Sequence, residues 1–404
     1  MSIEDAAEQV ADRLSESDSL RIYAHHDADG IASATIMCHA LNRLGKKFHL
    51  TIKDRISSEY IKKDETTLLC DFGASLEDLS EDVMVIDHHV PHFNGEYHVN
   101  PRLSGIDGDK ELSASGAAYI TANFMGDNRD LSGLALLGII GDRQNIAGKN
   151  QDIINEGIAN QFIIPNRGLK LAGRNLKEQL YTALDPYLCG ISGDEEKVNE
   201  ILRISTKEDK CNYKTLLSNI ILNTAENTNE IAMQSLWGDT YELERGVIHD
   251  AHSMSAVIEA CGLSKRGGLG VALCLRMTHG VEEAWDITVK HRLKVISAIK
   301  NLQKNEESFP LFEVSNPQTA SNVADSLAFD SLYDTPVFVI VDSGEKYSVS
   351  ARCPAGVECD LSEFMRKIAE GTGGTGGGHK CRAGATFEKE GLSFFKKELK
   401  EAFC

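Results

Sequence analysis

Long apolar runs and prolines are scarce in this sequence. Only 8 of the 404 residues are proline and 25% are charged, so the chain is not disordered over long stretches. No apolar run reaches the roughly 18 residues that a membrane-spanning helix needs. The opening segment, MSIEDAAEQVADRL, lacks a basic stretch followed by an apolar one and does not resemble a signal peptide. We therefore expect a cytoplasmic chain that has no membrane partner.

Closely spaced cysteine pairs are also absent. The 10 cysteines are scattered and none belongs to a CxxC pair, which argues against a zinc knuckle. Without a secretory signal, we expect reduced thiols that serve mainly as small buried apolar residues.

Basic residues are outnumbered in this chain. There are 42 Lys and Arg residues against 61 Asp and Glu residues, which gives a formal net charge of −19. A chain this acidic does not coat duplex DNA, because neutralising the phosphates requires a basic surface. It could still hold the end of a strand in a local basic groove, or gather carboxylates around a metal ion.

The first 150 residues alternate short apolar runs with helical patterns, which is typical of an α/β domain with a parallel sheet. The length itself indicates two or three domains at about 150 residues each. The predicted strands cover residues 20–24, 67–70 and 83–86, and the predicted helices cover residues 31–44, 74–82 and 130–140.

The rest of the chain predicts two further parts. Residues 151–280 read as a mostly helical extension of the first domain, and residues 281–304 as one long helix within a linker that runs to residue 308. Beyond it, strands at 335–341 and 347–351 and a helix at 361–369 predict a smaller α+β domain over residues 309–404.

Acidic clusters directly follow the three predicted strands. The first strand is followed by HHDADG (25–30), the second by Asp71, and the third by Asp87, His88 and His89. Because the carboxyl ends of parallel strands share one edge, where ligands bind, these side chains should converge. Asp142, in GDRQ (141–144), could close the site. Each cluster alone could be an ordinary turn, but three such clusters plus Asp142 make that alternative much weaker.

Converging carboxylates point to metal-dependent chemistry. Several carboxylates at one edge repel each other strongly unless cations lie among them. Carboxylate oxygens together with imidazoles suit Mn²⁺ or Mg²⁺. Two such ions about 3.5–4 Å apart can clamp a phosphate ester for in-line attack. Asp71 is a good candidate for a carboxylate shared by both ions.

The glycine run GTGGTGGGHK (371–380) allows two interpretations. Composition alone favours a flexible linker. However, glycines also let backbone N–H groups approach an anion, and cationic residues follow at once. Ser350 and Arg352 share a face of a predicted strand, where an arginine could hold a phosphate or form a surface ion pair.

The predicted long helix is rich in basic residues. They form either a solvated face or one wall of a groove for a nucleic acid backbone. These residues are Lys290, Arg292, Lys294, Lys300 and Lys304.

At this point the motifs are recognisable. HHDADG, CDFG, DHH and GDRQ, in this order and spacing, resemble the four motifs of the DHH phosphoesterase superfamily. SAR (350–352) and GGGHKCRAG (376–384) resemble the DHH-associated C-terminal domain. More narrowly, LDPYLCGISGD (184–194) and GGLGVALCL (267–275) resemble the archaeal RecJ-like single-strand exonucleases, a group that includes a GINS-associated nuclease.

The resemblance implies a DHH core over residues 1–150 and an exonuclease that uses two Mn²⁺ ions, or Mg²⁺, on single-stranded nucleic acid. It places metal ligands at Asp27, Asp29, Asp71, His88 and Asp142, with His25 as a further candidate. Asp87 and His89 would orient ligands or contact the scissile phosphate. The C-terminal domain would hold the substrate through Ser350, Arg352, Gly376, Gly377, Gly378 and His379.

Some members of the superfamily have lost their metal ligands, including a eukaryotic helicase cofactor. This chain keeps all of them, which implies activity. It lacks an obvious extra nucleic-acid-binding domain of the kind that bacterial RecJ carries, which puts processivity on long DNA in doubt.

Three functions stay open on the sequence. The first is an exonuclease that trims single-stranded DNA or RNA to mononucleotides, with 5′-to-3′ polarity favoured and a role in DNA replication or repair. The second is a phosphodiesterase for small substrates such as nanoRNA or cyclic dinucleotides, which the acidic charge favours. The third is a replication scaffold that binds GINS and the replicative helicase.

Overall fold

The computed structural model describes residues 1–62, 65–76, 79–80, 82–208, 210–302, 309–357 and 359–403. The chain divides into two compact units. The first comprises Met1–Gly168 and Asp239–Thr288, and the second comprises Leu169–Gly238 and Val289–Cys404. In the described residues, no helix is both long enough and apolar enough to cross a membrane.

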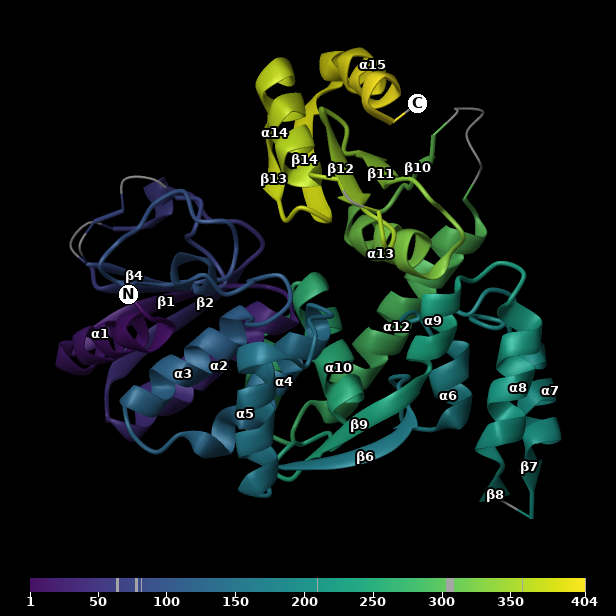
Figure 1. Ribbon diagram of the computed structural model, residues 1–404, viewed down its shortest axis with the longest axis horizontal. Coiled ribbons are helices and arrows are strands. Elements are labelled where there is room, and N and C mark those ends of the chain that lie inside the picture. The colour runs from purple at the N-terminus through teal and green to yellow at the C-terminus, as the bar shows by residue number, and fades with distance from the viewer. Residues whose placement is uncertain are drawn as a thin grey trace. The chain divides into compact units, whose positions relative to one another are not determined.

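The first unit is built on a parallel sheet, as predicted (Figure 1). Its strands run in the order β2-β1-β3-β4-β5, and every neighbouring pair is parallel. The three predicted strands are β1, β3 and β4, and two of the predicted helices are α2 and α4. The elements are α1 (Ile3–Glu16), β1 (Ser19–His25), α2 (Ala28–Arg43), β2 (Lys47–Lys53), β3 (Thr67–Cys70), β4 (Val83–Ile86), β5 (His98–Val99), α3 (Ala114–Phe124), α4 (Ser132–Gly141) and α5 (Gly148–Ala159).

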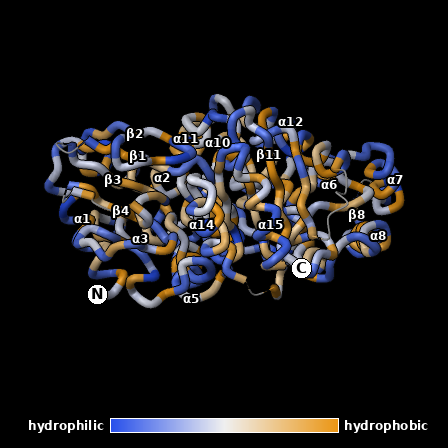
Figure 2. Tube along the Cα trace, turned by 90° about the horizontal axis from the view of Figure 1, so that it is seen from above, coloured by the Kyte–Doolittle hydropathy of each residue, from blue (hydrophilic) through white to orange (hydrophobic). Residues whose placement is uncertain are grey.

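Both faces of this sheet are covered, which explains why β3 and β4 are buried at every position. The hydropathy colouring in Figure 2 marks these strands as apolar. One face packs against α1, α2 and α3 through a core that includes Ile22, Leu68 and Met84. The opposite face, with Tyr23 and Leu69, is covered by loop residues rather than by helices.

The predicted helix over residues 74–82 is wrong. The described part of this stretch is turn and irregular backbone, and Glu77, Asp78 and Glu81 lie outside the described residues. Leu76 and Leu79 pack against the loop-covered face of the sheet. The spacing of these two leucines therefore reflects their packing against the sheet and does not indicate a helix.

A later part of the chain completes the first unit. The strand pair β6 (Ile163–Leu169) and β9 (Trp237–Leu243) leads into α10 (Ala251–Leu263) and α11 (Gly267–Cys274). These helices share a core with α2 and α4 that contains Ile31, Leu137 and Ile258. The two long strands were not predicted, because β6 exposes four consecutive residues and shows no alternation.

The second unit contains a helical segment and a mixed α/β part. The helical segment consists of α6 (Leu176–Tyr181), α7 (Glu195–Ser205), α8 (Tyr213–Thr224) and α9 (Glu230–Ser235), with the short strands β7 (Thr206–Lys207) and β8 (Lys210–Cys211). The predicted long helix is α12 (Val281–Lys300), which belongs to the first unit up to Thr288 and to the second from Val289. Lys304, like the rest of residues 303–308, lies outside the described residues.

The C-terminal part of the second unit is a five-stranded mixed sheet with helices, as predicted. The strands run in the order β10-β11-β12-β14-β13, with β10 parallel to β11 and the other pairs antiparallel. The elements are β10 (Leu311–Glu313), α13 (Ala320–Asp330), β11 (Val337–Asp342), β12 (Lys346–Arg352), α14 (Leu361–Thr372), β13 (Thr375–Gly378), β14 (Arg382–Glu388) and α15 (Leu392–Phe403).

Cys353 and Cys359 form a disulfide, with Cα atoms 7.1 Å apart. The expectation of reduced thiols is therefore wrong for this pair. The two residues flank a turn at 355–356, and a six-residue separation carries no CxxC signal. Four other cysteines, Cys38, Cys70, Cys261 and Cys274, are buried. Cys404 lies outside the described residues.

Candidate metal centre

The first acidic motif forms the turn from β1 into α2. Asp27 is the N-cap of α2, and its Oδ1 accepts a hydrogen bond from Gly30 N at 2.9 Å. Its Oδ2 lies 2.6 Å from Nδ1 of His25, the last residue of β1. Burial alone would raise the pKa of Asp27, but the charge and hydrogen bond of His25 bring that pKa well below its ordinary value. The turn therefore holds an ionised carboxylate beside an imidazole.

Asp29 lies in the first turn of α2 and is buried among helices. Its carboxylate accepts backbone hydrogen bonds from Ala114 N at 2.8 Å and Ser115 N at 2.9 Å, at the start of α3. Burial and the nearby carboxylates of Asp142 and Asp71 together raise the pKa of Asp29 to about 8. A positive charge beside Asp29 would relieve this cost.

Asp71 follows β3 in a left-handed backbone conformation, with φ of 57°, which is strained for a residue with a side chain. Its Oδ2 lies 3.2 Å from His25 Nδ1, and its Oδ1 lies 3.3 Å from His88 Nε2. The Oδ1 atom is buried and has no hydrogen-bond partner within the described part of the chain. A buried carboxylate oxygen without a donor is costly, so this atom is well suited to ligate a cation.

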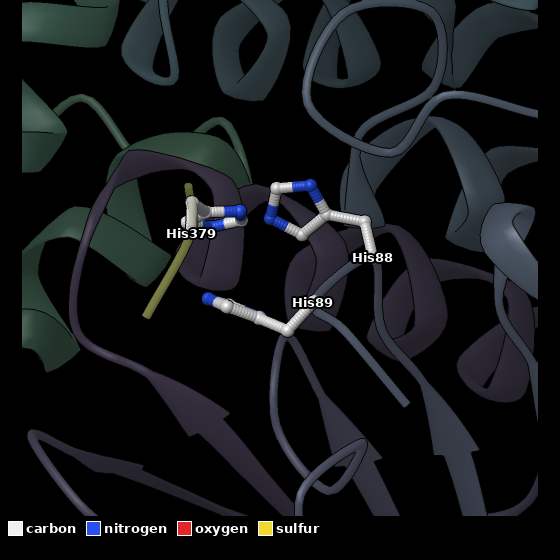
Figure 3. Close-up of side chains that lie close together, drawn as sticks. All are labelled: His88, His89 and His379. Carbon is white, nitrogen blue, oxygen red and sulfur yellow. The ribbon is translucent and has the colours of Figure 1, made fainter. Parts of the chain in front are cut away.

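His88 and His89 follow β4, and their rings lie close together, with centroids 4.8 Å apart (Figure 3). His88 Nδ1 lies 2.6 Å from the carbonyl oxygen of Gly108, which can only accept, so Nδ1 must carry the proton. This leaves Nε2 pointing toward carboxylate oxygens. Burial opposes protonation of His88, but those carboxylates raise its pKa well above the ordinary value.

The oxygens around His88 Nε2 belong to three different motifs. Asp142 Oδ2 lies 3.2 Å away, Asp71 Oδ1 3.3 Å and Asp29 Oδ2 3.9 Å. Asp142 is the C-cap of α4, so the buried helix positions it. A neutral Nε2 lone pair would repel these oxygens unless a proton or a metal ion lies between them. The donor set therefore fits a divalent cation, with the imidazole oriented from behind by a backbone carbonyl.

Asp87 holds the loop that carries the two histidines. It accepts hydrogen bonds from Ala74 N at 2.8 Å, His88 N at 2.7 Å and His89 Nδ1 at 2.7 Å. Burial alone would raise the pKa of Asp87, but the charge and hydrogen bond of His89 bring it well below the ordinary value. Because Nδ1 of His89 is engaged in this way, its Nε2 is the nitrogen that can reach a substrate or a metal.

The structure thus brings all eight N-terminal candidate residues to one edge of the sheet. They form three ligand sets, and within each set the donor atoms lie within 4.8 Å of one another. The sets are His25, Asp27 and Asp71; Asp29, His88 and Asp142; and Asp71, Asp87 and His89. Asp71 belongs to two of them. Carboxylate oxygens with imidazole nitrogens are ligands that Mn²⁺ and Mg²⁺ accept.

Several supporting residues were not foreseen from the sequence. Gln144 Nε2 donates to the carbonyl oxygen of Gly108 at 2.9 Å, and Asn150 Nδ2 donates to Gln144 Oε1 at 2.8 Å. From α10, Glu259 Oε2 accepts from Ala28 N at 2.7 Å. Gln144 could have been noticed because it stands in GDRQ. Asn150 and Glu259 carry no local signal.

Glycines allow the helices to approach the site this closely. A Cβ atom at Gly138 of α4 would lie 2.0 Å from Asp29 Oδ1, and one at Gly262 of α10 would lie 1.5 Å from the carbonyl oxygen of His26. Only glycine avoids these clashes. The packing of α4 and α10 therefore fixes the acidic turn that begins α2.

The C-terminal candidates lie on the sheet of the second unit. Ser350 and Gly377 both pair in register with Gly384, on opposite sides of β14. The glycine segment is therefore an edge strand and not a linker, and it contains Gly376 and Gly378. Gly377 and Gly378 have positive φ, as glycine permits. His379 follows the strand, in a tight turn in which its N–H donates to Arg382 O at 2.8 Å.

Arg352 forms a buried ion pair and not the surface pair that was considered. Its Nε donates to Asp325 Oδ1 at 2.5 Å, and its Nη2 donates to Ser321 Oγ at 2.6 Å. Both Arg352 and Asp325 are buried. Asp325, on α13, was not foreseen from the sequence. It orients the guanidinium and partly neutralises it.

Two family models match the chain. The "DHH family, N-terminal domain" model matches residues 19–139, and the "DHHA1 domain" model matches residues 311–403. The first match contains the edge of the sheet where the carboxylates meet, except Asp142, and the second contains the mixed sheet with its glycine strand.

Proteins similar to this chain include an uncharacterised protein of Methanocaldococcus jannaschii, which is 27% identical over 95% of this chain and 92% of its own length. The single-stranded-DNA-specific exonuclease RecJ of Bacillus subtilis is 25% identical over 54% of this chain and 32% of its own length.

The crystal structure of RecJ in complex with Mn²⁺ from Thermus thermophilus has the same fold, with a TM-score of 0.62 and 17% identity. The match covers 99% of this chain but only 54% of that one. The present chain thus spans about half of the Thermus RecJ and about a third of the Bacillus RecJ.

The parallel sheet with acidic strand ends, followed by a second α/β sheet that carries a glycine edge strand, defines a two-part phosphoesterase. Together with the matches, this shows that the chain belongs to the DHH superfamily and is a RecJ-like protein. It is accordingly a hydrolase of the DHH phosphoesterase family.

Proposed function

We propose that this protein is a manganese-dependent exonuclease that hydrolyses single-stranded DNA or RNA to mononucleotides with two metal ions. One observation carries the proposal. Asp71, whose buried Oδ1 lacks a hydrogen-bond partner among the described residues, belongs to two of the three ligand sets. Such a carboxylate is what a pair of neighbouring cations requires.

Each candidate residue has a role that follows from its position. His25, Asp27, Asp29, Asp71, His88 and Asp142 would hold the ions. Divalent cations at such a centre polarise the phosphate and lower the pKa of bound water. His89 is the more exposed of the two neighbouring histidines, with 34% of its side chain accessible against 4% for His88. We therefore assign His89 to the scissile phosphate and Asp87 to the orientation of its ring.

The choice of substrate rests on the relatives. The Bacillus relative is named for its action on single-stranded DNA, and the Thermus structure was obtained with Mn²⁺. A 5′-to-3′ polarity and a role in DNA replication or repair complete the proposal. Association with GINS and the replicative helicase stays a prediction from the resemblance.

The C-terminal sheet would hold the nucleic acid backbone. Ser350 and the glycine strand offer a hydroxyl and backbone N–H groups on neighbouring parts of one sheet. Arg352 and His379 would add charge and a further donor. We also propose that residues 1–150 form the DHH core, that 151–280 extend it, that 281–308 link it to the last part, and that 309–404 form the DHH-associated domain.

The test uses the full chain, Mn²⁺ and 20-mer single strands of DNA and RNA, labelled at the 5′ or the 3′ end. We expect labelled mononucleotide to be released early from the 5′ end and not from the 3′ end. Asp142→Ala should abolish release, whereas Asp152→Ala, on α5, should not. Intact 20-mers together with cleaved dinucleotides would replace the proposal with a small-substrate phosphodiesterase. The absence of any cleavage would favour the scaffold.

A further inference from the structure

An exposed aromatic ring lies beyond the end of β2, outside the ligand sets described above. Tyr60 is 58% exposed, although it belongs to the short 3-10 turn Ser58–Tyr60, which is well anchored. Ile56 and Ile61 on either side pack against the loop-covered face of the sheet. Tyr60 itself contributes backbone contacts, since its N–H donates to Ser57 O at 3.0 Å. The ring therefore projects outward from a turn that packed isoleucines hold on both sides.

A cation lies on this ring. Lys53 Nζ is 3.7 Å from the centroid of the Tyr60 ring. Lys53 is the last residue of β2, and in the parallel pairing with β1 its partner is His25. Adjacent strands lie about 4.8 Å apart, so Lys53 begins beside the first residue of the metal centre. Tyr60 therefore lies within the reach of one lysine side chain from that edge.

A single exposed ring is ordinary by itself. This one is distinguished by its neighbours. Arg55 and Lys62 are also exposed in the same loop, so three basic residues, against the two acidic residues Asp54 and Glu59, lie in the ten-residue stretch from 53 to 62. The ions proposed for the neighbouring centre would bind the phosphate that is cleaved. Phosphates elsewhere on the strand need other cations, and this loop offers them beside the edge where β1 and β2 end.

From this geometry we infer a nucleobase-binding subsite in which Tyr60 stacks a base of the substrate strand while Lys53 and Arg55 contact the adjacent phosphates. Exposed aromatic rings interleaved with cations are the usual means of holding single strands without regard to sequence. The subsite rests on the proposed function, because it lies at the edge of the same centre. It specifies that function further, since it requires a substrate with at least one base beyond the cleaved bond.

The experiment measures kcat/KM with Mn²⁺ on 20-mer DNA strands that carry one abasic position, moved stepwise from the cleaved end. The wild type should be slowed at one position by about 5- to 150-fold, the range expected from base–aromatic stacking. Tyr60→Ala should be slower by a similar factor on the intact strand and should lose its sensitivity at that position. Tyr60→Phe keeps the ring and should behave as the wild type.

Two controls separate stacking from other effects. Phe124→Ala removes a ring that is 43% exposed at the end of α3 and should leave the abasic profile unchanged. Lys53→Ala should weaken binding evenly at all positions and reduce the salt slope by about one. If the wild type cleaves strands and Tyr60→Ala keeps the full abasic profile, the subsite is refuted and the nuclease stands. A wild type that cleaves no strand refutes both.

Discussion

Gly138 offers a sharp test of the centre, because it lies on α4 and carries no reactive group. A methyl group at this position would lie 2.0 Å from Asp29 Oδ1 and 2.2 Å from Ser115 Oγ, both closer than atoms can approach. Gly138→Ala should therefore displace the Asp29 carboxylate from at least one of the two backbone amides at the start of α3 that donate to it.

The cost follows from three contributions. Overpacking in a dense interior costs about 1–3 kcal/mol. The loss of one hydrogen bond to a charged group costs about 1.5–3 kcal/mol. The gain in helix propensity from glycine to alanine returns at most about 1 kcal/mol. We expect Gly138→Ala to lower the free energy of unfolding by about 2–5 kcal/mol, and to weaken Mn²⁺ binding about 10- to 100-fold because a ligand moves.

Urea unfolding without metal gives the stability, and the Mn²⁺ dependence of cleavage gives the affinity. Gly133→Ala is the matched control, because it lies on the same helix and its Cβ would meet only the flexible end of Leu243, at 3.1 Å. It should be neutral or slightly stabilising. If Gly138→Ala matched Gly133→Ala in stability and in Mn²⁺ dependence, the placement of Asp29 against α4 would be refuted.

Three further outcomes are expected. Burial would raise the pKa of Asp130, but hydrogen bonds from Arg43 and Arg276 lower it to about 2. The ionised carboxylate therefore stabilises the fold at a pH above its ordinary pKa, and this stabilisation is lost as the pH falls from about 4 to 2. Asp130→Asn should reduce the free energy of urea unfolding by about 1–2 kcal/mol at pH 7 and by much less at pH 2. His89→Ala should lower kcat by about 100-fold with little change in the Mn²⁺ concentration that gives half-maximal rate. If Mn²⁺ affinity fell by a factor similar to that for kcat, His89 would be a metal ligand instead. Asn150→Ala removes the hydrogen bond that holds the glutamine of GDRQ behind the centre. It should raise the Mn²⁺ concentration that gives half-maximal rate about tenfold, and an unchanged Mn²⁺ titration would contradict the role of Asn150.

The strands and their acidic ends could be predicted from the sequence because they depend on local pattern. A parallel sheet collects its strand ends at one edge, so Asp27, Asp71 and Asp87 could be grouped without any coordinates. The spacing of apolar residues gave a wrong helix where loop residues cover the sheet, as Leu76 and Leu79 do. It gave no strand prediction where a strand exposes most of its residues, as β6 does.

The residues that hold the candidate site residues in place could not be predicted, because they are distant in sequence. Glu259 reaches Ala28 across 231 positions, and Asp325 reaches Arg352 from a separate helix. Nothing in the neighbourhood of either acid distinguishes it from a solvated surface carboxylate. Only the packing of the helices brings these acids to the groups that they hold.

The divided first unit has a consequence for the order in which the protein is made. Its segments, Met1–Gly168 and Asp239–Thr288, are separated by seventy residues of the second unit. Every metal-ligand candidate lies in the first segment, but α10, which holds the HHDADG turn through Glu259 and Gly262, lies in the second. A nascent chain therefore exposes a complete set of carboxylates well before it contains the helix that braces them. Premature termination within the intervening residues would release a fragment that carries all the ligands on an unsupported turn.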